Sequence, residues 1–166
     1  MRLAIISDTH MPKGPRRLPD ACVERLRAAD VILHAGDRSR IEVLRELEAL
    51  GPPVHAVHGN VDDAAVRRVL PATRTVELAG GARIAMVHDA GPSGGRLARM
   101  RRAFPGADAV VFGHSHIPLH ERDEADGFQI FNPGSPTERR RSPRHTMGEG
   151  TVGEDGRLEL RLVDLD

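Results

Sequence analysis

Seven side chains that can ligate metal ions follow short apolar runs at five places along the chain. They are carboxylates, imidazoles and one carboxamide: Asp8, His10, Asp37, Asn60, His88, His114 and His116. These donor groups suit Mn, Fe, Zn or Ni, and the lack of a thiolate among them argues against a structural zinc site. One carboxylate, such as that of Asp37, can bridge two ions through its oxygens. The residue types therefore predict a dinuclear metal centre.

The spacing of these residues indicates that their side chains meet at a single site. In Asp8-Thr9-His10 and His114-Ser115-His116, one residue separates the two ligands, which directs both side chains to the same side of an extended loop. Glycines stand directly before Asp37, Asn60 and His114, and they allow the sharp turns and close backbone approach that such loops need.

Two divalent ions about 3.5–4 Å apart lower the pKa of a water that they share. The resulting hydroxide can attack phosphorus in line while the ions neutralise the nonbridging oxygens, so no protein nucleophile is needed. Ser7, Thr9 and Ser115 flank the ligands, but none lies in the nucleophile elbow of a serine hydrolase. The sequence favours metal-assisted hydrolysis over a Ser/His/Asp mechanism.

Alternating strands and helices position these residues in the first half of the chain. Apolar runs predict strands at 3–7, 31–35 and 54–57, and helical spacing predicts helices at 18–29 and 41–50. This order is typical of a parallel sheet, and ligands bind beyond the carboxyl ends of such strands.

The second half of the chain changes character after the third predicted strand. It predicts a β-hairpin at 74–78 and 83–87, a helix at 95–104, and strands at 109–112, 128–131, 151–152 and 158–163. No repeat or linker divides the 166 residues, so we expect a single domain over 1–166. The exposed hairpin around Val76 and Leu78 would offer an edge for a homo-oligomer.

The overall composition limits the choice of partners. The formal net charge is +0 and the chain has no Trp or Tyr, so we expect no dedicated nucleic-acid surface, and any anion binding must be local. Arg139 to Arg144 is predicted to be a solvated basic loop. No apolar run reaches the ~20 residues of a membrane helix. The one cysteine, Cys22, is predicted to lie in the core, and we expect a cytoplasmic protein.

The order of the motifs resembles the calcineurin-like metallophosphoesterase superfamily, and most closely its small bacterial and archaeal phosphodiesterase branch. The segments that carry the resemblance are Asp8-Thr9-His10, Gly36-Asp37, Gly59-Asn60-Val61-Asp62, His88, Gly113-His114-Ser115-His116 and Asn132-Pro133-Gly134-Ser135. The resemblance implies an α/β (α+β) fold: a two-sheet β-sandwich flanked by helices in an αββα order, with a dinuclear metal site at the carboxyl ends of the strands.

The resemblance also implies roles for the ligands. Asp8, His10 and His116 would hold the first ion, Asn60, His88 and His114 the second, and Asp37 would bridge them. Asp37, His10 and Asn60 would act in catalysis through the metal-bound hydroxide. The expected activity is hydrolysis of a small phosphodiester with two divalent ions, Mn in vitro or else Fe, Zn or Ni.

The chain departs from the larger phosphatases of the superfamily at one catalytic position. They have a histidine after Gly-Asn that protonates the leaving group, and this chain has Val61 there. Arg38, next to Asp37, is expected to reach the substrate phosphate. Asp62 and Asp89 are expected to be a loop cap or surface carboxylates.

Two other functions stay open at this point. One is a phosphomonoesterase or nucleotidase. The other is a metal-binding scaffold without catalysis, because a eukaryotic trafficking subunit resembles this fold and uses its surface to bind proteins. The complete ligand set favours the enzyme. The natural substrate, the native metal and the oligomeric state do not follow from the sequence.

Overall fold

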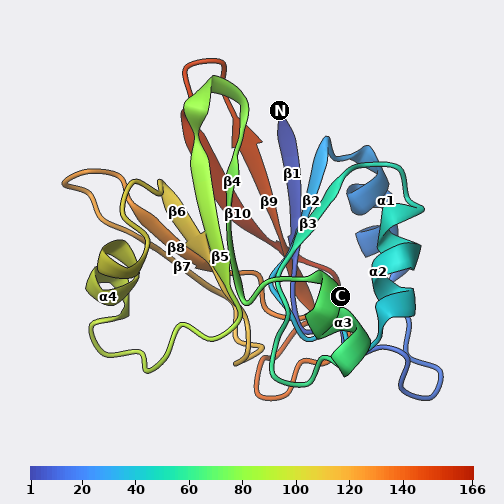
Figure 1. Ribbon diagram of the computed structural model, residues 1–166. Helices are drawn as coiled ribbons and strands as arrows, with labels where there is room; N and C mark the ends of the chain where they lie inside the picture. Colours follow the sequence, from blue (N-terminus) through green and yellow to red (C-terminus); the bar gives the residue numbers. More distant parts are fainter.

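The computed structural model describes residues 1–166 and has two five-stranded sheets packed face to face (Figure 1). The first sheet has the order β10-β9-β1-β2-β3 and the second the order β4-β5-β6-β8-β7. The strands of the first sheet are β1 (Arg2–Ile6), β2 (Val31–His34), β3 (Val54–Ala56), β9 (Thr146–Val152) and β10 (Leu158–Asp164). Those of the second are β4 (Thr73–Glu77), β5 (Arg83–Val87), β6 (Ala109–Val111), β7 (Leu119–Arg122) and β8 (Gln129–Asn132).

Four helices flank the sheets. They are α1 (Asp20–Ala28), α2 (Ile41–Glu48), α3 (Ala64–Val69) and α4 (Arg96–Ala103), and a short 3-10 turn, η1 (Ala79–Gly81), joins β4 to β5. Figure 1 shows α1 and α2 beside the first sheet and α4 beside the second. The order of layers is therefore αββα, as the resemblance implied.

The apolar core is divided among these layers. Leu3 and Ile5 face Phe131 and the other buried residues between the sheets, while Ala4 and Ile6 face Cys22 and Leu26 on the helical side. This division follows from the strand period of two, which directs neighbouring side chains to opposite faces. A third cluster packs α4 against the outer face of the second sheet.

Both sheets place the carboxyl ends of parallel strands at the same end of the sandwich. β1 pairs in parallel with β2, and β2 with β3, while in the second sheet β6 pairs in parallel with β5 and β8. The amino terminus of β1 is at the top of Figure 1, so these ends lie at the lower side. The loops that carry the seven candidate ligands all leave from this side.

Most predicted elements are present, and some details of the predictions were wrong. The hairpin of β4 and β5 and the three N-terminal strands are confirmed. Helix α3 and strand β7 were not predicted, because both are short and largely exposed, which leaves little apolar pattern. Only the last two residues of β9 were predicted, since its Gly148 and Gly150 interrupt the apolar pattern.

The hairpin edge does not expose the side chains that were predicted there. Val76 and Leu78 are buried between the two sheets. These two residues therefore form no exposed apolar surface that would support a homo-oligomer. None of the helices is long and apolar enough to cross a membrane.

Candidate metal centre

Two groups of ligand residues lie side by side where the parallel strands end. Asp8, His10 and His116 form the first, and their ligand atoms all lie within 4.8 Å of one another. Oδ1 of Asp8 is 3.3 Å from Nε2 of His116 and 3.7 Å from Nε2 of His10. The two imidazole nitrogens are 3.2 Å apart. All three residues are buried, so the loops after β1 and β6 build this group inside the protein.

Asp37, His88 and His114 form the second group by the same criterion. Oδ1 of Asn60 joins them, 3.1 Å from Nε2 of His88 and 3.1 Å from Nδ1 of His114. This group is more open than the first, because His114 and Asn60 are exposed. The structure thus brings together all seven candidate ligands.

One oxygen of Asp37 faces both groups. Its Oδ2 is 3.1 Å from Nε2 of His88 and 3.8 Å from Nε2 of His10. Its Oδ1 is turned away and accepts a hydrogen bond from the backbone N–H of Val61 at 2.9 Å. The arrangement leaves a single oxygen, Oδ2, in the place where a bridging ligand would be needed.

Backbone carbonyls fix which nitrogen two of the histidines present. Nδ1 of His88 donates to the carbonyl of Ala35 at 2.8 Å, and Nδ1 of His116 donates to that of Glu138 at 2.6 Å. A proton on Nδ1 leaves Nε2 as a lone-pair donor, as found in metal-ligating histidines. In both residues Nε2 is the atom that faces the carboxylates.

The donor set passes a test for metal binding that does not depend on the resemblance. Oδ1 of Asp8 is buried and has no hydrogen-bond partner. Its Oδ2 accepts from the hydroxyl of Ser7 at 2.7 Å and from the N–H of His114 at 3.0 Å. An unpartnered buried carboxylate oxygen costs stability unless a cation compensates it. Oxygen and imidazole donors at this density fit divalent transition metals.

The two carboxylates of the site are ionised, which favours the binding of cations. Burial alone would raise the pKa of Asp8, but the close imidazoles of His10 and His116 hold it well below the usual range. Burial opposes the ionisation of Asp37 too, yet its contact with His88 lowers the pKa of Asp37 and raises that of His88. Both carboxylates therefore stay charged at neutral pH.

The backbone of the ligand loops is unusual. Five ligand residues, none of them glycine, have positive φ: Asp8 (56°), His10 (43°), Asp37 (56°), His114 (71°) and His116 (61°). Such residues are a few per cent of non-glycine positions and tend to cluster at functional sites. The neighbouring glycines are required because a side chain at their positions would overlap other atoms. A Cβ on Gly59 would overlap the Asp37 carboxylate, and one on Gly113 would overlap Ser7 and Asp8.

The segment Asn132-Pro133-Gly134-Ser135 holds two ligand loops together. Nδ2 of Asn132 donates to the carbonyl of Gly113 at 3.0 Å, next to His114. The hydroxyl of Ser135 donates to the carbonyl of Asp8 at 2.9 Å. This segment begins at the last residue of β8, and its two hydrogen bonds fix the loop after β1 relative to the loop after β6.

Asp62 has a larger role than the predicted loop cap. This buried carboxylate accepts three backbone N–H bonds, from Asp37 at 3.0 Å, Ser39 at 2.7 Å and Gly59 at 2.7 Å. Asp37 and Gly59 belong to the loops after β2 and β3. Asp62 therefore fixes the Asp37 ligand relative to the Asn60 ligand. Asp89, in contrast, is exposed and accepts from Gly91, as a loop cap does.

The prediction that Arg38 contacts the substrate was wrong, because Arg38 does not lie at the surface of the site. Its side chain is fully buried, Nη2 donates to the carbonyl of Val57 at 3.0 Å, and Nη1 is 3.6 Å from Oδ2 of Asp62. Burial lowers the pKa of Arg38, and Asp62 and Asp37 oppose that shift. The guanidinium thus lies behind the ligand loops as the counter-charge of Asp62.

His34 stands beneath the site in neutral form. Burial and the charge of Arg38 lower its pKa well below the usual range. Its Nδ1 accepts from the N–H of Gly36 at 3.1 Å, and its Nε2 lies 3.1 Å from the hydroxyl of Thr9. His34 supports the ligand loops through these two contacts.

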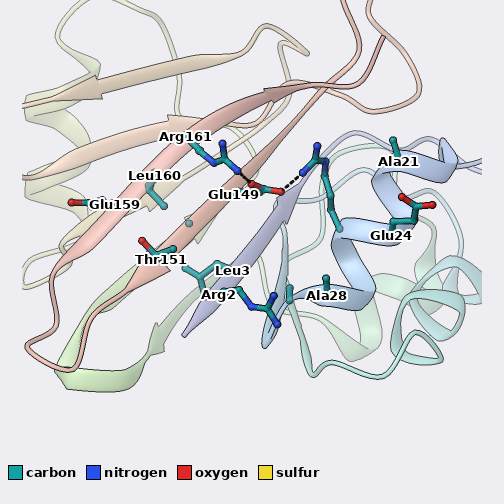
Figure 2. A pocket seen from close by; sticks show the side chains of 13 residues that line it. Arg2, Leu3, Ala21, Glu24, Ala28, Glu149, Thr151, Glu159, Leu160 and Arg161 are labelled. Carbon is teal, nitrogen blue, oxygen red and sulfur yellow. Dashed lines mark hydrogen bonds and ion pairs between the residues drawn. The ribbon is translucent and has the colours of Figure 1, made fainter.

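A groove lined by α1, β1, β9 and β10 lies away from these ligands (Figure 2). It has a volume of about 800 Å³ and runs between α1 and the outer face of the first sheet, at the amino end of β1. Glu149 on its floor pairs with Arg25 at 2.8 Å and also with Arg161. Its central charges neutralise each other, and it has no cluster of ligand atoms.

Solved structures with this architecture define the class of the fold. Vps29 of Entamoeba histolytica, solved as a zinc complex, superposes with a TM-score of 0.77 at 22% identity over 100% of both chains. A structure described as a novel archaeal phosphodiesterase superposes with a TM-score of 0.69 at 20% identity, over 98% of this chain and 100% of that one. At these identities, the likeness shows a shared fold of the Vps29 and metallophosphoesterase type.

Sequence comparison gives the family. The calcineurin-like phosphoesterase superfamily domain matches residues 1–155. The probable metallophosphoesterase of Methanothermobacter thermautotrophicus is 34% identical over 139 residues, which cover 82% of this chain and 78% of that protein. The chain belongs to the calcineurin-like phosphoesterase superfamily. Its membership supports a hydrolase that acts on phosphoester bonds.

Proposed function

We propose that this protein is a metal-dependent phosphodiesterase that hydrolyses a small phosphodiester. The observation that carries the proposal is the pair of ligand groups that share Oδ2 of Asp37. In this proposal, Asp8, His10 and His116 hold one divalent ion, and Asn60, His88 and His114 hold the other. Mn²⁺ is our choice for assay, since oxygen and imidazole donors accept it.

Two ions bound there would lower the pKa of a shared water and offset the charge of the phosphoryl oxygens. Backbone groups of the chain hold the ligand side chains in position. The N–H of Val61 holds Oδ1 of Asp37, and the carbonyls of Ala35 and Glu138 orient His88 and His116. These contacts are made within the chain itself, and they hold the ligand side chains in fixed orientations for ions and substrate.

The side chain after Asn60 bears on the type of ester. Val61 is 48% exposed beside the second group and has no proton to give. A leaving group must then take its proton from another group or from solvent, or leave without one. Aryl diesters meet this condition because a phenolate is a good leaving group, and they are the substrates that we would assay first.

The proposal is tested with an aryl phosphodiester and an aryl phosphomonoester side by side. Metal-stripped protein would be assayed with and without Mn²⁺. The variant Asp37→Asn keeps the volume and the bond from Val61 but removes the bridging charge, and Asp63→Asn is the matched control. We expect metal-dependent diester hydrolysis that is lost in Asp37→Asn and kept in Asp63→Asn.

Other results of this assay would change the assignment. Preference for the monoester would keep the site and make the protein a phosphomonoesterase. Metal binding without hydrolysis of either ester would contradict the enzyme and favour the scaffold.

A further inference from the structure

Two loops beside the metal centre carry most of the local positive charge. Residues 11–18 follow the first ligand loop, and residues 133–144 follow β8. Together they contain one carboxylate, Glu138, and seven cations: Lys13, Arg16, Arg17, Arg139, Arg140, Arg141 and Arg144. The whole chain has a formal net charge of +0. The excess on these loops is therefore a local feature, and such a concentration attracts anions.

The second loop is attached directly to the ligand residues. The hydroxyl of Thr137 donates to the carbonyl of Thr9 at 2.7 Å, between Asp8 and His10. The carbonyl of Glu138 accepts from Nδ1 of His116 at 2.6 Å. The arginines that follow Glu138 are exposed, as the prediction of a solvated loop for 139–144 requires, and this attachment holds them next to the metal centre.

Two arginines contact the backbone of the ligands, one at each group. Nη1 of Arg16 donates to the carbonyl of His10 at 3.3 Å, beside the first group. Nη1 of Arg140 donates to the carbonyl of His114 at 3.4 Å, beside the second group. Each guanidinium is anchored through one nitrogen and keeps other N–H donors for a ligand.

The charges of these arginines are only partly compensated. Oε1 of Glu138 lies 3.4 Å from Nη2 of Arg16 and 3.9 Å from the amine of Lys13. Arg140 forms no ion pair with a carboxylate. Arg144, on the same loop, is different, because its Nη1 lies 2.6 Å from Oδ2 of Asp164. Arg17, Arg139 and Arg141 also form no ion pair, so Arg16 and Arg140 differ from them by their contacts with the ligand carbonyls.

We infer that Arg16 and Arg140 form a subsite for a second phosphate group of the substrate. Guanidinium groups match phosphate oxygens with paired N–H donors. The inference rests on the proposed diesterase function and narrows its substrate class to small phosphodiesters that carry at least one further phosphate. The absence of Trp and Tyr leaves charge, rather than base stacking, as the means of recognition.

The test uses two substrates that differ only in the extra phosphate. The dinucleotide ApA and its 5′-phosphorylated form pApA contain the same scissile bond. At fixed ionic strength with Mn²⁺, we expect kcat/KM for pApA to exceed that for ApA about tenfold, and the ratio to fall to about one in Arg16→Ala/Arg140→Ala. Arg144→Ala is the control on the same loop, and it should keep the wild-type ratio.

A second measurement does not depend on turnover. Adenosine 3′,5′-bisphosphate and adenosine 5′-monophosphate would be titrated calorimetrically into metal-stripped protein. We expect the bisphosphate to bind about tenfold more tightly, and the double variant to lose this difference.

The outcomes separate the subsite from the proposed function. Hydrolysis of bis(p-nitrophenyl) phosphate with a pApA to ApA ratio near one, or a ratio unchanged in the double variant, would overturn the subsite and leave the diesterase standing. No hydrolysis of any diester would remove the diesterase. In that case, equal binding of the two nucleotides would remove the subsite as well, and preference for the bisphosphate would retain it as a phosphate-binding site.

Discussion

Replacement of Asp62 by Asn tests whether one buried carboxylate holds the ligand loops in place. Oδ2 accepts from the N–H groups of Asp37 and Gly59, and Oδ1 accepts from that of Ser39. An amide has one oxygen, so in either orientation its NH₂ group faces at least one backbone N–H. The substitution also removes the only carboxylate that lies within 4.0 Å of the buried Arg38 guanidinium.

The expected cost follows from these two losses. A hydrogen bond to a charged acceptor contributes about 1.5–3 kcal/mol. Loss of one partner of a buried ion pair costs about 3–5 kcal/mol. The two terms overlap, because the same carboxylate makes both interactions, so we expect the free energy of unfolding to fall by about 4 kcal/mol. A domain with ordinary stability of about 5–15 kcal/mol would still fold.

Urea denaturation of metal-stripped protein measures this change, with Asp63→Asn as the matched control. Asp63 is the neighbouring residue and caps α3 by accepting from the N–H of Val66 at 2.9 Å. Asn and Asp are equally good caps, so the control should change stability by less than about 0.5 kcal/mol. Asp62→Asn should also weaken Mn²⁺ binding about tenfold or more, because Asp37 loses its anchor. A stability loss no larger than that of Asp63→Asn would refute this role of Asp62.

Three further predictions concern space, reactivity and metal binding. Gly59→Ala should reduce Mn²⁺ affinity in calorimetry about tenfold or more, because the new Cβ would overlap the Asp37 carboxylate, whereas Gly94→Ala, which meets no atom within 4 Å, should not. Equal affinities of these two variants would contradict the packing argument. Burial raises the pKa of the Cys22 thiol to about 12, so at pH 8 native protein should not react with a thiol reagent, and urea should expose one thiol. Rapid reaction in the native state would contradict the burial. Mn²⁺ at about 100 times its Kd should stabilise metal-stripped protein by about 2.7 kcal/mol and raise Tm by roughly 5–10 °C. An unchanged Tm would argue against metal binding by the folded state.

Much of the site could be predicted from ligand types and their places at strand ends. The pairs Asp8–His10 and His114–His116 and the glycines before Asp37, Asn60 and His114 were recognised in the sequence. Parallel pairing then brings the ends of the strands together. These predictions succeeded because strand ends and turns are governed by local chemistry, and because carboxylates and imidazoles have few roles that need such spacing.

The role of Arg38 could not be read from its position in the chain. A residue beside a ligand can point to the substrate or to the core, and the positive φ of Asp37 and the place of Asp62 decide which. Strand β4 is an edge strand as expected, but the prediction that Val76 and Leu78 are exposed was wrong for a related reason. The strand pattern does not tell which face of a hairpin the other sheet will cover.

The sequence by itself therefore indicated the αββα architecture and the family, through the resemblance that its motifs carry, and it predicted the seven candidate ligands. Local patterns set these, because the strand period, the turn glycines and the order of the motifs are properties of neighbouring residues. Only the tertiary structure decided that Asp62 connects two ligand loops and that Arg16 and Arg140 contact the carbonyls of His10 and His114. These are contacts between loops brought together by folding, and their geometry depends on how the two sheets pack.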